Sequence, residues 1–261
     1  MKIIAAAVLF TMITIAGFTQ VNQGELQDLP PVTFINYEGP HSRVDTREQI
    51  RQIGVGLGPA ASNSDGRLGA NNRYFIIHSV TDAEGNKIDA DIMGLGVDVG
   101  VDHVRNLRVI IQGYLQAAYK YTEKDAALLS EYITIYNAVY RGNWDYFTER
   151  YKTPVMQNVT REKAGLSIRY DEWPGRTLLL IPLGIGGLSS IDTSTISDSR
   201  VVEEMRKEDD RGVEQRRDMV DLKEREAAQA EQRARTEREA IKEEERKVTE
   251  DRKQLEEDKE A

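Results

Sequence analysis

The stretch VRNLRVIIQGYLQAAYKYTEKDAALLSEYITIYNAVYRG, residues 104–142, carries the strongest folding signal in the chain. In its first half, apolar residues recur at intervals of three and four: Val104, Leu107, Ile111, Tyr114, Leu115 and Ala118. A second stripe follows Thr122, which can cap a helix: Leu128, Tyr132, Ile135, Tyr136, Val139 and Tyr140. This spacing puts apolar side chains on one face of a helix, so the stretch predicts two helices that share a core.

Shorter elements are expected on both sides of these helices. Residues 73–80 read as a buried strand, and residues 166–170 and 177–183 read as two strands joined by a loop. Asp45 and Glu48 fit a capping box for a helix that Gly54, Gly56 and Gly58 would end. Residues 63–72 and the segment around Gly94 to Gly100 read as loops. With helices gathered in the middle, residues 41–187 predict one α+β globular domain rather than repeated βαβ units.

The first residues have the composition of a secretory signal. A lysine at position 2 precedes an apolar run from Ile3 to Phe18, and residues 1–20 are therefore expected to be a signal peptide, with an uncleaved anchor as the alternative. Residues 21–40 follow as a linker or edge strand containing Pro30 and Pro31. The chain has no cysteine, so neither a disulfide nor a lipid-modified cysteine is available to the exported protein.

The C-terminal part is predicted to be a long charged helix. Residues 188–200 are rich in Ser, Thr and Asp and read as a hinge, and residues 201–261 are helix-forming throughout. If continuous, that helix would reach about 90 Å. Ion pairs at four-residue spacing, such as Asp221 with Arg225, would support it, and a partly frayed, solvated helix is the alternative.

One apolar residue recurs at every seventh position of this tail, and we call the set the seam: Val213, Val220, Ala227, Ala234, Ile241, Val248 and Leu255. A coiled coil needs a second apolar position three or four residues later. Three residues later the tail has Arg216, Lys223, Ala230, Glu237, Glu244 and Asp251, almost all charged. The tail is therefore expected to be a single helix or a weak coiled coil, and its self-association is expected to be weak.

The charge of the chain argues against nucleic acid as a partner. Its net charge is −9, and the basic residues are interleaved with acidic ones, so no basic patch stands out.

One loop offers candidate ligand-binding residues. Asp98, Asp102 and His103 cluster in the segment from Gly94 to His103, although Asp102 is more simply a cap for the helix that begins near Val104. Asp89 and Asp91 resemble part of a calcium loop, but Met93 stands where an oxygen ligand is needed, so that interpretation fails. No metal site, cofactor or catalytic residue is assigned.

Three tyrosines at four-residue spacing form a second candidate binding surface. Tyr132, Tyr136 and Tyr140 could line a carbohydrate or peptide groove. The simpler explanation is packing in the core, with hydroxyl groups at its rim.

Four strings carry a family resemblance: RVDTREQI at 43–50, GVDHVRNLR at 100–108, IYNAVYRG at 135–142 and GLSIRYDEWPG at 165–175. Together they resemble the spirochaete 83/100-kilodalton antigen family of Borrelia and Treponema type, over residues 35–185 and in the character of the charged tail. The resemblance implies an envelope-associated protein, periplasmic or outer-membrane-associated. Members usually continue into a further C-terminal domain, so a short or truncated form is expected here. No catalytic residue carries over from the family.

Two functional hypotheses follow. The first is a non-catalytic structural or interaction protein of the cell envelope, whose globular domain binds an envelope protein or a peptidoglycan-associated partner and whose helix is a spacer. The alternative is a periplasmic metal-dependent enzyme or ligand-binding domain that uses the loop from Gly94 to His103. Titration with metal ions during thermal unfolding would separate the two, because an ion that binds the native state stabilises it.

Overall fold

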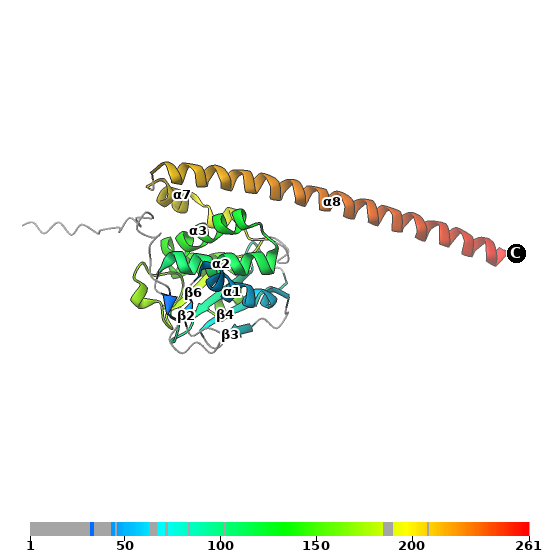
Figure 1. Ribbon diagram of the computed structural model, residues 1–261. Coiled ribbons are helices and arrows are strands. Elements are labelled where there is room, and N and C mark those ends of the chain that lie inside the picture. The colour runs from blue at the N-terminus through cyan, green and yellow to red at the C-terminus, as the bar shows by residue number, and fades with distance from the viewer. Residues whose placement is uncertain are drawn as a thin grey trace, which may run out of the picture.

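The computed structural model describes residues 32–33, 43–44, 46–62, 67–70, 73–82, 84–101, 103–184, 190–207 and 209–260. A globular body is followed by one long helix that extends past it (Figure 1). The predicted signal peptide, most of the predicted linker at 21–40 and part of the predicted hinge lie outside the described residues. The α+β class is confirmed, and the long charged helix is confirmed in part.

The sheet of the body has four strands, all antiparallel, in the order β3, β4, β5 and β6. Their bounds are Arg67–Ala70, Tyr74–Ser79, Ala90–Leu95 and Thr177–Pro182. The strands predicted near 73–80 and 177–183 are thus confirmed as β4 and β6. Two further short strands, β1 at Val32–Thr33 and β2 at Arg43–Val44, pair separately from this sheet.

Strands β3 and β5 correct two loop predictions. A loop was expected from Gly94 to Gly100, but Gly94 and Leu95 belong to β5, a central strand that is buried along its whole length. Gly94 lies opposite Phe75 in the register of β4 and β5, and a Cβ at Gly94 would lie 2.0 Å from the ring of Phe75. The glycine therefore makes room for an aromatic ring across the strand pair rather than ending the strand.

The strand predicted at 166–170 is absent from this described segment, which instead runs into the 3₁₀ turn Tyr170–Glu172. The indole Nε1–H of Trp173 donates to the carbonyl of Ser167 at 2.7 Å, and this hydrogen bond folds the segment back on itself.

The free edge of β6 is partly covered by Asn137, which lies in the helix Glu123–Val139. The side chain of Asn137 bonds both the N–H and the carbonyl of Leu180 at 2.9 Å. A buried edge needs such partners because unpaired backbone groups are costly.

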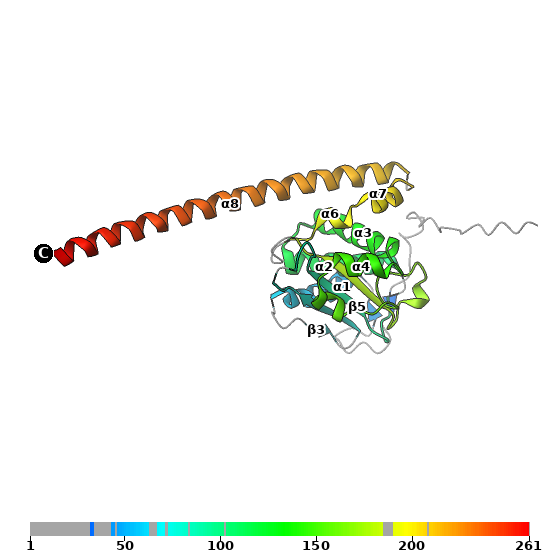
Figure 2. The same cartoon turned by 180° about the vertical axis from the view of Figure 1, so that it is seen from behind.

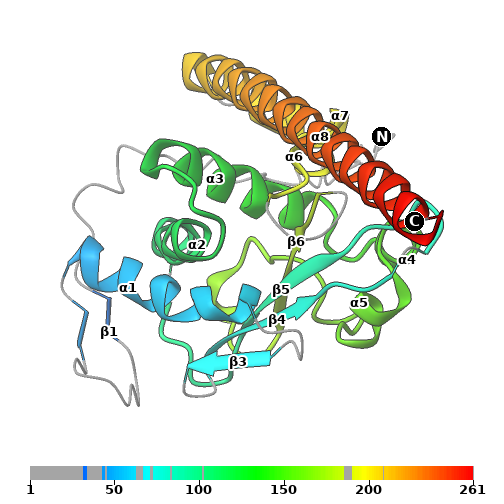
Figure 3. The ribbon, with the colours of Figure 1, turned by 90° about the vertical axis from the view of Figure 1, so that its right-hand side faces the viewer.

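Three helices form a layer beside the sheet (Figure 3): α1 Arg47–Leu57, α2 Val104–Tyr119 and α3 Glu123–Val139. The two central helices match their prediction, and Thr122 caps α3 as expected. Helix α1 is capped by Thr46 and Gln49, one residue after the predicted box. Two small helices follow α3, namely α4 Trp144–Arg150 and α5 Thr153–Gln157.

Glycine lets α1 and α2 approach closely instead of ending α1. Gly54 lies inside α1, and a Cβ there would lie 1.8 Å from the carbonyl oxygen of Ile110 in α2. Gly113 of α2 makes the reciprocal approach, since its Cβ would lie 2.1 Å from the carbonyl oxygen of Arg51. A 3₁₀ turn, Gly58–Ser62, continues directly from α1.

The segment predicted as a hinge contains one short helix and the start of a second. They are α6 Thr193–Ile196 and α7 Ser199–Arg206, capped by Asp192 and Asp198, and Ile196, Val201 and Met205 are buried. The long helix, α8, then runs over Asp209–Glu260. The tail was predicted to be one helix from residue 201. It is instead two helices, since α7 ends at Arg206 and α8 begins at Asp209.

Candidate functional site

The first part of α8 lies on α3 and forms what we call the docked base, residues 212–226. Met219 and Leu222 are only 2% and 3% exposed, and Gln215 is buried beside them. Gly212 packs so closely against α7 that a Cβ would lie 2.0 Å from the carbonyl oxygen of Met205. The docked base therefore joins the globular body through a small apolar contact.

Polar contacts frame this apolar centre. Arg225 pairs with Asp125 of α3 at 2.6 Å, instead of with Asp221 of its own helix as predicted. Lys124 of α3 pairs with Asp218 at 2.9 Å. The amide of Gln215 donates to the buried carboxylate of Glu131 at 2.5 Å.

Glu226, at the end of the docked base, also binds the body. Its carboxylate accepts from the hydroxyl of Tyr121 at 2.7 Å and from that of Thr193 at 3.4 Å. Burial raises the pKa of Glu226 above the ordinary value of a glutamate. The same Tyr121 hydroxyl accepts from the backbone N–H of Ile191, so one side chain ties α8 to the segment before α6.

Helix α7 provides a second attachment. The carboxylate of Asp198 caps α7 through two backbone N–H groups and accepts from the hydroxyl of Tyr140 at 2.5 Å and of Tyr146 at 3.3 Å. The rings of Tyr140 and Tyr146 are stacked at 3.6 Å, and the guanidinium of Arg200 lies over Tyr140 at 5.0 Å. The start of the tail is therefore held by aromatic and charged contacts as well as by α8.

Beyond Glu226 the side chains of α8 are exposed from Ala227 to Thr249, and we call residues 227–260 the free rod. Figures 1 and 2 show this part leaving the body on one side. The seam is exposed along both parts of α8: Val213 is 57%, Val220 53%, Ile241 50% and Val248 66% exposed. Leu255 lies in the last turns, where only the backbone is described.

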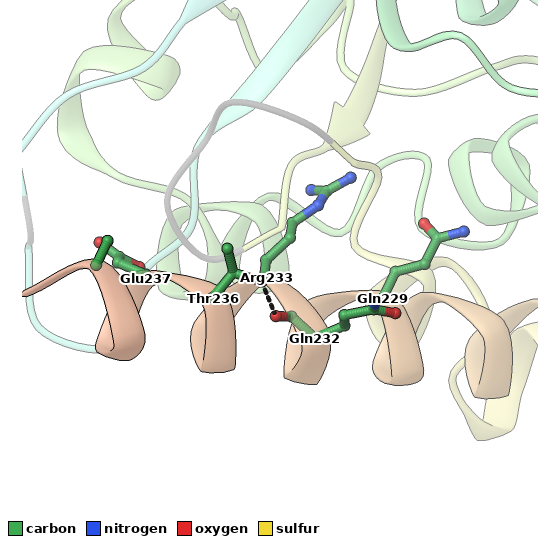
Figure 4. Close-up of a pocket in the computed structure, with 6 residues that line it drawn as sticks. Gln229, Gln232, Arg233, Thr236 and Glu237 are labelled. Carbon is green, nitrogen blue, oxygen red and sulfur yellow. Dashed lines mark hydrogen bonds between the residues drawn. The ribbon is translucent and has the colours of Figure 1, made fainter. Parts of the chain in front are cut away.

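A shallow open recess lies along α8 just beyond the docked base (Figure 4). Its described lining comes from this helix: Gln229, Gln232, Arg233, Thr236, Glu237 and Ala240. Long polar side chains on a single helix do not form an enclosed binding site.

The loop from Gly94 to His103 does not gather its predicted ligands among the residues that can be described. Asp98 is exposed in a turn, and Asp102 lies outside the described residues. The Nδ1 atom of His103 accepts from the backbone N–H of Arg105 at 3.1 Å, so His103 is the cap of α2 that Asp102 was expected to be. The described part of the chain contains no group of three His, Cys, Asp or Glu side chains that could hold a metal ion.

The groove interpretation of the three tyrosines is wrong. Tyr132, Tyr136 and Tyr140 are all buried in the core, and each hydroxyl has a partner inside the protein. Burial raises the pKa of Tyr132 to about 12.

A buried polar cluster lies under α2, and the sequence did not predict it. The fully buried carboxylate of Asp91 accepts from Nδ1 of His78 at 2.6 Å, from the hydroxyl of Tyr114 at 2.5 Å and from the hydroxyl of Tyr119. His78 and Asp91 lie opposite each other on β4 and β5. Nothing in the local sequence links four residues this far apart, so only the fold could reveal the cluster.

A buried ion pair lies just before β5. The ammonium of Lys152 donates to Asp89 at 2.7 Å and to the carbonyl of Thr81 at 2.8 Å. Both clusters tie the sheet to the surrounding helices and satisfy charges that burial would otherwise make costly.

Comparison with known proteins gives one match. No curated protein and no solved structure matches the chain. Among the described helices, none is long and apolar enough to cross a membrane. The sequence pattern of the family described as Borrelia P83/100 protein matches residues 29–261, which include the four strings noted above, the docked base and the free rod. The chain belongs to the Borrelia P83/100 protein family, and the resemblance to the spirochaete 83/100-kilodalton antigens is confirmed.

Proposed function

We propose that this protein is a non-catalytic structural or interaction protein of the cell envelope, in which the globular body binds a partner and the free rod is a spacer. The observation that carries the proposal is the division of α8. Residues 212–226 are held against the body, whereas the side chains from Ala227 to Thr249 are exposed to solvent. A rod anchored over several turns projects in one direction, which a flexible tether does not.

The length and composition of the free rod suit a spacer. At 1.5 Å per residue, residues 227–260 extend about 50 Å beyond Glu226. Ion pairs on its surface, Arg235 with Glu239 at 3.4 Å and Arg246 with Glu243 at 2.8 Å, support a helix that has no core of its own.

The expected location of this protein is outside the cytoplasm, in the periplasm or at the outer membrane. The composition of residues 1–20 and the family membership support this part of the proposal. The partner is proposed to be an envelope protein or a peptidoglycan-associated component. Nucleic acid is not proposed, because the net charge is −9 and acidic residues are interleaved with the basic ones.

Small-angle scattering of the chain without residues 1–20, at a dilution where it is monomeric, tests the spacer. We expect a maximum dimension above the length of α8, about 78 Å, and a radius of gyration well above the roughly 18 Å of a compact protein of this size. A compact particle would contradict the proposal.

A further inference from the structure

Helix α8 presents two separate faces, and the body covers only one of them. The docked base contacts the body through Gln215, Met219, Leu222 and Glu226. In the docked base, each seam residue comes directly after a residue that packs on the body: Val213 follows Gly212, and Val220 follows Met219. One position along a helix is a rotation of about 100° around its axis, so the seam faces away from this contact. Val213 and Val220 are therefore 57% and 53% exposed even where α8 is docked, so the seam is accessible from Val213 to Val248.

We propose that α8 pairs with α8 of a second copy of this chain in antiparallel orientation, along the seam, with the two-fold axis near Gln232. The inference rests on the proposed function, since it gives the spacer a second body at its far end. It is carried by charge complementarity along the seam, which favours an antiparallel pair over a parallel one.

The charges beside the seam change sign along the helix. Three residues after successive seam positions, the chain carries Arg216 and Lys223 in the docked base, then Ala230, then Glu237 and Glu244 in the free rod. A parallel, in-register pair would place each of these charges against its own copy, which is repulsive. An antiparallel pair instead brings the basic end of this row on one helix, at Lys223, to the acidic end of the same row on the other, at Glu244.

The heptad spacing defines which residues meet. In an antiparallel pair each seam residue faces the residue at the second core position of the partner helix, and a two-fold axis at Gln232 pairs Val220 with Glu244 and Lys223 with Ile241. These layers are adjacent, so the ammonium of Lys223 and the carboxylate of Glu244 from the partner helix come together while their aliphatic stems cover the seam.

The charges on the outer flank of the seam also favour the antiparallel pair. Arg217 and Glu224 are exposed on the side of α8 away from the body. The same axis brings Arg217 near Glu245 of the other helix and Glu224 near Arg238, so both flanking pairs have opposite signs.

The centre of the pair is built from small residues. Ala227, Ala230 and Ala234 lie around the axis and allow the two helices to approach closely there. At the axis itself like charges meet, since Glu231 and Arg233 each lie near their own copies. The pair is therefore expected to be reversible, with the two bodies at opposite ends of the overlap.

Crosslinking tests the orientation directly, because the chain has no cysteine of its own. In the antiparallel pair, Val220→Cys and Glu244→Cys introduce thiols that face each other across the interface, whereas within one helix these positions are about 36 Å apart. With a short thiol-specific crosslinker, the double variant is expected to give a covalent dimer, and each single variant is expected to give none.

Crosslinking of Val220→Cys to itself would show a parallel pair, and failure of the double variant to crosslink at high protein concentration would show no pair at the seam. Either result overturns the proposal. Small-angle scattering distinguishes the failure of this proposal from failure of the spacer proposal. If the chain is an extended monomer that does not crosslink, the spacer proposal stands and only the antiparallel pair is contradicted.

Charge reversal gives a second, independent measurement. Lys223→Glu places like charges in two symmetric positions of the pair, so the dissociation constant of the dimer is expected to rise by roughly tenfold. Adding Glu244→Lys restores opposite signs and is expected to return the constant to its original value. Sedimentation equilibrium measures both, and an unchanged constant in the single variant contradicts the proposal.

Discussion

The carboxylate of Asp91 accepts hydrogen bonds from three donors and has no exposed surface, so its partners must all lie inside the protein. In Asp91→Asn, the new amide cannot accept from all three donors and introduces a donor of its own. We expect a loss of about 2–4 kcal/mol in the free energy of unfolding, measured by urea denaturation.

Asp98→Asn is the matched control for this change. Asp98 is exposed in the turn after β5, so its replacement is expected to stay within about 0.5 kcal/mol of the native protein. Equal effects of the two substitutions would show that the buried cluster does not stabilise the fold.

The buried tyrosines are expected to ionise only at strongly alkaline pH. Burial holds the pKa values of Tyr114, Tyr136 and Tyr151 well above the usual value and raises that of Tyr132 to about 12. Because the folded protein disfavours the ionised form, this stability is fully present below the unfolded pKa of about 10 and is lost as pH rises through the folded values.

Ultraviolet absorbance of tyrosinate, followed together with circular dichroism, measures this titration. We expect the buried group to ionise only as the fold is lost at alkaline pH. Ionisation of all tyrosines near pH 10 with the fold intact would contradict the burial described here.

At the scale of elements, the crossing of α1 and α2 depends on glycine. Alanine normally stabilises a helix relative to glycine, but in Gly54→Ala the new Cβ would lie 1.8 Å from the carbonyl oxygen of Ile110. We expect a destabilisation of about 1–3 kcal/mol in thermal or urea unfolding, because the two backbones must move apart.

Gly56 of the same helix provides the control, since a Cβ there meets nothing within 4 Å. Gly56→Ala is expected to stabilise the protein by up to about 1 kcal/mol. If both substitutions stabilise, the close approach of the two helices is not a feature of the molecule in solution.

The elements that the sequence predicted are those with a strong local pattern. The stripes of residues 104–142 predicted α2 and α3, including the cap at Thr122, because each helix buries one face. Strand β5 was missed because Gly94 and Asp91 are unusual in a buried strand, and the residues that accommodate them are distant in sequence: Phe75 covers the glycine, and Tyr114 and Tyr119 bind the carboxylate.

The docked base was missed for a related reason. The heptad pattern predicted an apolar seam that includes Val213 and Val220, and both are exposed. The contact with the body depends on other residues, namely Gln215, Met219 and Leu222. On α3, Glu131 is the partner of Gln215 and Asp125 is the partner of Arg225, and no periodicity in the tail reveals either pair. Of the two explanations given for Tyr132, Tyr136 and Tyr140, packing in the core is the correct one, and Tyr140 caps the C-terminal end of α3.

At the scale of the whole molecule, the contact around Leu222 determines whether α8 is a fixed rod or a loose tail. Leu222→Ala removes most of a side chain that is 3% exposed, and we expect it to weaken the docked base by about 2–5 kcal/mol. Hydrogen exchange of the amides in residues 212–226 measures this loss.

Val220→Ala is the paired control, two residues away in the same helix and 53% exposed. Its effect on exchange of the docked base is expected to be within about 0.5 kcal/mol. Equal acceleration by both changes would indicate that the base is not docked through Leu222.

The distance between the body and the free rod tests the central claim most directly. Spin labels at Glu149→Cys on α4 and Ala240→Cys on α8, both exposed positions, are diluted with unlabelled chain so that only distances within one molecule are measured. A docked base predicts one narrow distribution of distances between the two labels. A broad distribution would show that α8 swings on a hinge and would contradict the fixed rod.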